Sequence, residues 1–375
     1  MNPLGDVLAR RIRAHGPLTV ADFMAEALGH PEYGYYTTRD PLGRAGDFTT
    51  APEISQVFGE LIGLWCADLW SRMGRPDPIV LAELGPGRGT LMRDALRAAR
   101  LVPEFLAAAR LHLVETSPVL RRAQAKTLRD HKPAWHETIA TLPPGPLLVI
   151  ANEFFDALPI RQFVKTEAGW REKLVGLSAE TDDLAFALSP GITPAVALVP
   201  AALRDAPPGS VAEIGAASLS VMDGLAERLV AAGGAALVID YGYLGPTCGE
   251  TLQAVRRHQR HDPLESPGSA DLTAHVDFTA LAEAAHQAGA WSWGPVPQGA
   301  FLQALGIAAR LERLLQHAGP GQAADLGLAV RRLIDPAEMG TLFKVLCIAA
   351  PGLPPPAGFP EARPGVITRR PTEPR

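Results

Sequence analysis

The chain has 375 residues, of which 47% are hydrophobic and 20% are charged. This composition is typical of a globular protein. The length suggests two or three domains, or one large α/β domain that carries insertions. The formal net charge of −5 lacks the basic balance of a dedicated nucleic-acid binder. No apolar run of about 18 residues appears, so we expect no transmembrane helix.

The cysteines argue against a metal site, and the N-terminus argues against a secretory signal. Cys66, Cys248 and Cys347 have spacings that fit no metal site, and three cysteines cannot all pair. We therefore expect no metal, and thiols that are buried or kept in a reducing cytoplasm. The N-terminus contains Arg10 and Arg11 but no hydrophobic signal core, so it predicts a short amphipathic helix rather than a secretory signal.

Residues 1–75 are predicted to form an N-terminal helical and loop segment. A helical lead-in precedes an aromatic-rich loop, "HPEYGYYTTRDPLGRAGDFTTAPEIS". Ile54–Met73 then has apolar residues at helical spacing, and Gly74 follows as a stop.

From residue 76 to 350 we expect one α/β domain with a mostly parallel sheet. Strands alternate with helices, and the near-continuous apolar character of the strands is typical of strands buried on both faces. The predicted strands are Ile79–Glu83, Leu111–Glu115, Leu147–Asn152, Ala235–Tyr241 and Thr341–Ala349, and the predicted helices are Gly89–Arg100 and Pro118–Arg129.

Two insertions and a tail interrupt this rhythm. Residues 160–210 show strand-like alternation and predict an antiparallel insertion, after which Gly209–Gly233 predicts a helix. Residues 244–335 form the second insertion, with a polar loop over 244–275 and helices at Phe278–Ala288 and roughly 301–334. The proline-rich stretch 351–375 predicts a disordered tail.

A glycine loop follows the first strand in "IVLAELGPGRGTLM". Gly85, Gly87 and Gly89 let the backbone turn tightly and approach a ligand, and the helix behind them offers free N–H groups. No G-x-x-x-x-G-K-[ST] is present, which excludes a P-loop. The G-x-G-x-x-G of NAD and FAD sites is broken at Thr90.

S-adenosyl-L-methionine is the remaining cofactor. Glu83, at the end of the first strand, would face the amino group of the methionine portion. Glu115, at the end of the second strand, would take the ribose hydroxyls. The alternative is a glycine turn in another kind of α/β protein.

The segment "NEFFDALPIRQF" is the predicted site of methyl transfer. Asn152, Glu153 and Asp156 follow a central strand, at the edge where open α/β sheets bind ligands. Methyl transfer from a sulfonium needs positioning and exclusion of water rather than a covalent nucleophile. A carboxylate here can orient a cationic acceptor such as arginine. Alternatively, Asp156 caps a helix and Asn152 orders the turn.

"GDFTTAPEIS" is a second candidate element of the cofactor site. Gly46 allows an unusual backbone, Asp47 can cap or contact a ligand, and Thr49 and Thr50 offer hydroxyls. The structural alternative is a capping loop with Pro52 in the first turn of the next helix.

Three further features remain open. His275 is a candidate base, although a lone histidine is more often structural, and Asp277 is expected to cap the following helix. The cluster Arg256, Arg257 and Arg260 predicts a solvated face, or a contact with an acidic patch of a partner.

Taken together, the motifs identify a family. "GDFTTAPEISQVFGELIG", "ELGPGRGTL", "HLVE", "NEFFDALP", "GGAALVIDYG" and "ADLTAHVDF" occur in this order. Over about residues 5–350 the chain resembles the MidA family, the bacterial and mitochondrial relatives of complex I assembly factor seven. The resemblance implies a Rossmann-like class I S-adenosylmethionine-dependent methyltransferase fold with an added N-terminal segment and inserted elements.

The resemblance also implies a substrate and roles for residues. The mitochondrial member methylates an arginine of a complex I core subunit, with symmetric dimethylation, so a protein substrate is expected. By resemblance, Asn152 and Glu153 line the transfer site, and the cofactor is held by Glu83, Gly85, Gly87, Gly89 and Glu115. A bacterial, cytoplasmic protein is expected, or a mitochondrial one if the source is eukaryotic.

Other functions compete with this interpretation. The chain could be a non-catalytic assembly chaperone that binds S-adenosylmethionine, a nicotinamide or flavin oxidoreductase, or a methyltransferase that acts on a small molecule. The sequence predicts no oligomeric state.

Overall fold

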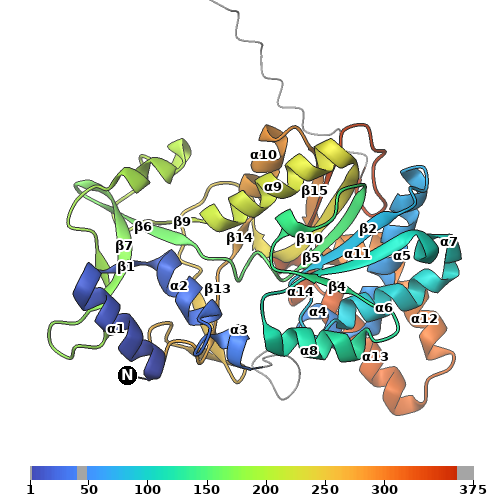
Figure 1. Ribbon diagram of the computed structural model, residues 1–375, viewed down its shortest axis with the longest axis horizontal. Helices are drawn as coiled ribbons and strands as arrows, with labels where there is room; N and C mark the ends of the chain where they lie inside the picture. The colour runs from blue at the N-terminus through green and yellow to red at the C-terminus, as the bar shows by residue number, and fades with distance from the viewer. Residues whose placement is uncertain (1, 40–48, 361–375) are drawn as a thin grey trace, which may run out of the picture.

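The apolar strands assemble into an eight-stranded sheet in the computed structural model, which describes residues 2–39 and 49–360 (Figure 1). Its order is β15-β16-β10-β5-β2-β3-β4, with β14 paired to β10. Neighbouring strands from β10 to β4 are parallel, and β16 is antiparallel to both of its neighbours. The strands are β2 (Ile79–Leu84), β3 (Ala109–Val114), β4 (Ala134–His136), β5 (Leu147–Asn152), β10 (Gly234–Tyr243), β14 (Val276–Asp277), β15 (Trp291–Pro297) and β16 (Phe343–Ala349). The predicted mostly parallel sheet is confirmed.

Helices cover both faces of this sheet. Leu81 packs into the layer of α5 and α6, whereas Val80 and Ala82 pack into the layer of α9 and α10, because successive residues of a strand point to opposite faces. The first layer contains α4 (Ala51–Ile54), α5 (Gln56–Arg72), α6 (Thr90–Ala98), η1 (Ala99–Leu101), α7 (Pro103–Ala108), α11 (Gln298–Ala304), α12 (Ile307–Leu315), α13 (Pro320–Ile334) and α14 (Met339–Leu342). The second contains α9 (Ala216–Ala232) and α10 (Phe278–Gln287), and α8 (Pro118–Thr127) follows β3.

The N-terminal helices form a second lobe with the first insertion and with the strands of residues 253–273, on the left in Figure 1. β1 (Leu18–Thr19) pairs with β7, which places α1 (Pro3–His15), α2 (Val20–Gly29) and α3 (Tyr35–Thr38) beside the inserted strands. The strands of this lobe are β6 (Arg161–Thr166), β7 (Gly169–Leu177), β8 (Leu184–Leu188), β9 (Val211–Ile214), β11 (Gln253–Arg256), β12 (Gln259–His261) and β13 (Asp271–Thr273). Residues 1–75 are therefore not one unit, because α4 and α5 pack on the central sheet.

Several expected boundaries change. The predicted helix at 209 begins at Ala216, because Val211–Ile214 pairs with β6 as a strand. The predicted polar loop 244–275 contains β11, β12 and β13, and the predicted helix 301–334 is three helices separated at Gly306 and Gly319. Short η helices occupy Ile139–Thr141, Pro194–Leu198 and Ala201–Leu203.

The first ten residues of the proline-rich stretch pack on the central domain, so the prediction of disorder is wrong for 351–360. Phe359 is 9% exposed, and its ring lies 5.3 Å from that of Phe301. Trp65 Nε1 donates a 3.0 Å hydrogen bond to the carbonyl oxygen of Ala357. Residues 361–375 lie outside the described residues. Within the described part of the chain, no helix combines the length and apolar character needed to cross a membrane.

Candidate active site

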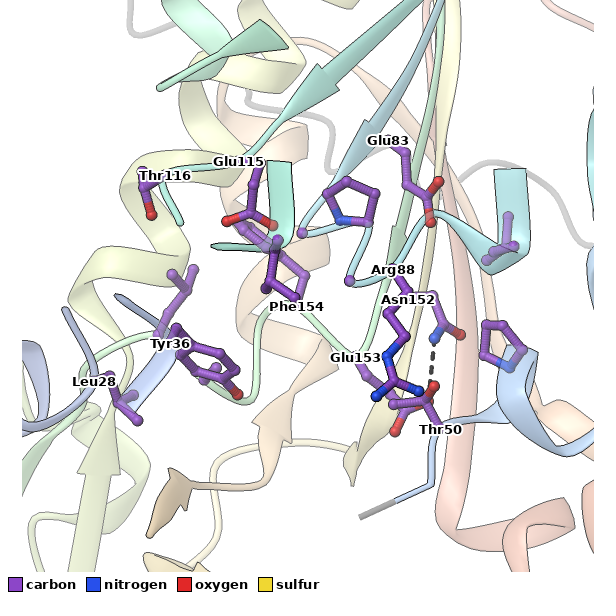
Figure 2. Close-up of a pocket in the computed structure, with 18 of the residues that line it drawn as sticks. Leu28, Tyr36, Thr50, Glu83, Arg88, Glu115, Thr116, Asn152, Glu153 and Phe154 are labelled. Atoms are coloured by element: carbon purple, nitrogen blue, oxygen red, sulfur yellow. Dashed lines mark hydrogen bonds between the residues drawn. The ribbon is translucent and has the colours of Figure 1, made fainter. Parts of the chain in front are cut away.

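A cavity of about 300 Å³ opens at the carboxyl ends of β2 and β5. The chain order reverses between these strands, since β2 continues to β3 on one side and β5 lies on the other. Such a switch point is where open α/β sheets bind ligands. Figure 2 shows Glu115 and Tyr36 on one side of the cavity, and Glu83, Asn152 and Glu153 on the other. Ala25, Leu28 and Tyr36 reach the cavity from the second lobe.

The glycine loop forms one wall, as predicted for two of its three glycines. Gly85 and Gly87 line the cavity with φ of +59° and +52°, a left-handed backbone that favours glycine. Gly89 does not line it, and its contact with the cofactor stays a prediction. An added Cβ on Gly89 would lie 3.2 Å from Leu128 Cδ1, because the chain has already turned toward α6 and α8 at this position.

Glu83 is a buried carboxyl group that has no ion pair with any described residue. It is 3% exposed and lines the cavity, and burial raises its pKa to about 8. Among the described residues, its Oε2 has no hydrogen-bond partner. A buried carboxylate without a partner is costly, and an ammonium group in the cavity would supply the missing donor and charge. The site therefore fits the amino group of S-adenosylmethionine.

Glu115 is held in a fixed position relative to the glycine loop. Its Oε1 accepts a 2.8 Å hydrogen bond from the backbone N–H of Ser117, and its Oε2 accepts one of 3.0 Å from Gln124 Nε2. The same Gln124 nitrogen donates to the carbonyl oxygen of Gly87 at 2.8 Å. Burial raises the pKa of Glu115. Its position after β3 suits the ribose hydroxyls, as the sequence predicted.

Glu153 occupies a strained turn after β5. Its φ is +48°, and such backbone strain at a non-glycine residue often marks a functional site. The backbone N–H of Glu153 donates to the carbonyl oxygen of Ile239 at 2.9 Å. Its Oε1 accepts hydrogen bonds from Ala51 N at 3.0 Å and from Asn152 Nδ2 at 3.1 Å, the latter dashed in Figure 2. Burial raises the pKa of Glu153 to about 7.

Asp156 lies behind this turn rather than in the cavity, so the helix-cap alternative is wrong and its role in methyl transfer stays a prediction. No helix begins at Asp156, and its Oδ2 accepts a 2.5 Å hydrogen bond from the Tyr241 hydroxyl. Burial raises the pKa of Asp156 to about 6. Asp240 Oδ2 accepts from the backbone N–H groups of Phe155 and Asp156, at 3.0 and 3.2 Å. These buried carboxyl groups hold the turn that carries Glu153.

The segment "GDFTTAPEIS" contributes only some of its predicted residues to the cavity lining. Thr50 lines the cavity and also precedes α4 as its N-cap residue, whereas Thr49 does not line the cavity. Gly46 and Asp47 lie outside the described residues. Glu53, which was not predicted as a site residue, lines the cavity and accepts a 2.5 Å hydrogen bond from Thr90 Oγ1.

The cavity is also lined by Tyr36, Arg88 and Phe154. None of these three residues was predicted to contact the cofactor. The Tyr36 hydroxyl donates to Asp271 Oδ1 at 2.8 Å. The aromatic-rich loop was the only signal for Tyr36, because its position depends on how the second lobe packs.

The remaining candidates lie elsewhere. His275 lines a separate cavity, where its ring packs edge-on to Tyr241 and burial lowers its pKa. Asp277 caps α10 as predicted, accepting from the backbone N–H groups of Thr279 and Ala280 at 3.0 Å. Arg257 lies in the exposed turn between β11 and β12, away from the cavity.

Comparisons with known proteins agree with this geometry. Residues 61–296 match a family whose description reads "Putative S-adenosyl-L-methionine-dependent methyltransferase". The chain is 40% identical to the Drosophila melanogaster protein named protein arginine methyltransferase NDUFAF7 homolog, mitochondrial, over 91% of this chain and 84% of that one. It is 38% identical to the Homo sapiens protein arginine methyltransferase NDUFAF7, mitochondrial, over 93% and 83%.

A solved structure has the same fold. A likely methyltransferase from Burkholderia thailandensis, bound to S-adenosyl-homocysteine, is 28% identical, with a TM-score of 0.81 over 95% of this chain and 93% of that one. The predicted class I fold and the predicted cofactor are confirmed. The chain belongs to the family of S-adenosyl-L-methionine-dependent methyltransferases that its residues 61–296 match.

Proposed function

We propose that the enzyme methylates an arginine side chain of a protein substrate. The main support is the position of Glu153, whose carboxyl group lines the cofactor cavity and is oriented by Ala51 and Asn152. A carboxylate matches the planar fork of a guanidinium. Similar proteins are named protein arginine methyltransferases.

The roles of the residues follow from their positions. Bound S-adenosyl-L-methionine supplies an electrophilic methyl group, with a thioether as the leaving group. Glu83, Gly85, Gly87, Glu115 and Asn152 hold the cofactor. Glu153 orients the guanidinium nitrogen for in-line attack on the methyl carbon. A pKa of about 7 suits Glu153 to accept the proton that the methylated nitrogen releases.

The substrate we propose is a subunit of respiratory complex I or of its bacterial counterpart. The resemblance to the MidA family supports this choice, and the similar proteins are named mitochondrial. For a bacterial source we propose that the enzyme acts in the cytoplasm. Asp156 is proposed to support the turn, and Thr49 and Gly46 remain candidates for cofactor contact.

Mass spectrometry of methylarginine in a deletion strain and its parent tests the proposal. The modification should be absent from one arginine of a complex I subunit in the deletion strain. Wild-type enzyme should restore it, and Glu153→Gln should not. Unchanged methylarginine would contradict the proposal. Labelled methyl groups found only in small molecules would indicate a small-molecule methyltransferase, and S-adenosylhomocysteine binding without any transfer would indicate a chaperone.

A further inference from the structure

A basic groove lies between α6 and α8, next to the cofactor cavity. Its volume is about 680 Å³. Its lining contains one carboxylate, Asp130, and six permanent cations: Arg88, Arg93, Arg97, Arg100, Lys126 and Arg129. These are six of the 35 lysines and arginines of a chain whose net charge is −5, so the groove has a local charge opposite to that of the whole chain.

Part of this positive charge is compensated beneath the groove. Arg93 and Arg97 bind the buried Asp94, and Arg97 also binds Glu60 at 2.8 Å. Arg310 binds Glu60 from the other side at 2.6 Å. Three arginines therefore share two carboxylates, and one positive charge remains in excess.

Three further cations, Arg100, Lys126 and Arg129, are available to a partner. Arg100 and Lys126 are exposed, and neither side chain has a hydrogen bond or ion pair within residues 2–39 and 49–360. Arg129 is 78% exposed, and its only ion pair within the described residues is with the equally exposed Asp130 at 3.9 Å. Such an exposed ion pair contributes little to stability and leaves Arg129 able to bind another anion. The distal half of the groove thus offers three cations to an anion.

The groove is continuous with the cofactor site. Arg88 directly follows Gly87 and lines both the cofactor cavity and the groove. Arg93, Arg97 and Arg100 follow it along α6 and η1. At 1.5 Å per residue, Arg93 to Arg100 spans roughly 10 Å, a distance that about three residues of an extended peptide cover.

We infer that this groove docks an acidic segment of the protein substrate while a nearby arginine reaches Glu153. The inference rests on the proposed protein substrate and specifies its sequence. Carboxylates should lie about three to six residues from the methylated arginine, given the helical and extended rises. Nucleic acid is less well matched, because no Trp, Tyr or Phe of the described chain lines the groove for base stacking.

Two variants with the same change in charge test the inference. The groove variant is Arg100→Glu, Lys126→Glu and Arg129→Glu. The control is Arg10→Glu, Arg260→Glu and Arg313→Glu, three exposed arginines that do not line the groove. Two arginine peptides are compared, one with glutamates three to six residues from the arginine and one with glutamines there. Peptide binding is measured by fluorescence anisotropy, and methyl transfer by radiolabel.

The acidic peptide should bind the wild type and the control at least tenfold more tightly than the groove variant, and the difference should shrink at high salt. The glutamine peptide should not distinguish the three proteins, and S-adenosylhomocysteine affinity should be equal in all. Equal binding of the acidic peptide to all three would overturn the inference, as would groove-dependent binding of a single-stranded RNA without binding of the peptide. If the acidic peptide binds through the groove but no arginine peptide is methylated, the docking surface stands and the proposed function fails.

Discussion

The backbone N–H of Ala51 donates a 3.0 Å hydrogen bond to Oε1 of Glu153, across 102 residues of sequence. This bond joins the start of α4 to the turn after β5. It fixes one carboxylate oxygen of Glu153, so the orientation of the proposed acceptor-binding group depends on two separate segments.

Glu153→Gln should abolish transfer without loss of cofactor. Glutamine preserves the size of the side chain and can still accept the hydrogen bond from Ala51, but it removes the charge that pairs with a guanidinium. We expect kcat/KM to fall by at least about 100-fold, equivalent to roughly 2.7 kcal/mol. The affinity for S-adenosylhomocysteine, measured by calorimetry, should change by less than about twofold.

Asp156→Asn is the matched control for this prediction. Asp156 is a buried carboxyl group of the same turn that does not line the cavity. Its replacement should lower kcat/KM by less than about tenfold, because the Tyr241 hydroxyl can donate to an amide oxygen as well. An Asp156 variant as inactive as Glu153→Gln would show that the turn, rather than the Glu153 charge, is responsible.

The pH dependence of transfer should report the ionisation of Glu153. Burial raises its pKa to about 7, and only the ionised form pairs with a guanidinium. The kcat/KM of the free enzyme should therefore rise as the pH increases through about 7. Steady-state rates across pH 5.5–9, at roughly constant ionic strength, test this. A kcat/KM that stays nearly flat from pH 5.5 to 9, as the ordinary glutamate pKa of 4.5 would give, would contradict it.

Glu83→Gln should weaken cofactor binding while stabilising the protein without cofactor. Burial raises the folded-state pKa of Glu83 from 4.5 to about 8. The folded protein thus holds the proton more tightly than the unfolded chain, and this contribution to stability is lost as the pH rises from 4.5 through about 8. At pH 8 the variant should melt above the wild type in the absence of cofactor.

The same variant should bind S-adenosylhomocysteine about 10- to 100-fold more weakly, as expected for the loss of a charge-assisted hydrogen bond. Differential scanning fluorimetry at pH 5 and pH 8, with and without S-adenosylhomocysteine, separates the two effects. If Glu83→Gln binds the cofactor as the wild type does, the cofactor's amino group lies elsewhere.

Phe359→Ala should destabilise the central domain. Phe359 packs against Phe301, and an alanine would leave a cavity there. Phenylalanine-to-alanine changes in cores cost about 3–5 kcal/mol, which corresponds to a drop in Tm on the order of 5–10 °C for a protein of this size. Leu328→Ala, at a side chain 65% exposed, is the control and should leave the Tm within about 2 °C of the wild type. Equal melting of the two variants would show that residues 351–360 contribute no stability.

The sequence by itself determined the frame of the site, because the relevant signals are local. Mostly apolar runs become the six-residue strands β2 and β5, and a parallel sheet collects their carboxyl ends at one edge. Glu83, Glu115 and Glu153 therefore had to lie near one another once the sheet was predicted. The spacing of the three glycines after β2 pointed to S-adenosyl-L-methionine. Glycine is favoured there because the backbone takes positive φ where it approaches a ligand.

Only the tertiary structure decided what surrounds that frame. Thr19 pairs with Leu174, and this long-range contact brings α2 and Tyr36 to the cavity. Asp156 accepts a hydrogen bond from the hydroxyl of Tyr241, which lies 85 residues away in the sequence, instead of capping a helix. Partners so far apart in sequence leave no local pattern, so only the folded chain brings them together.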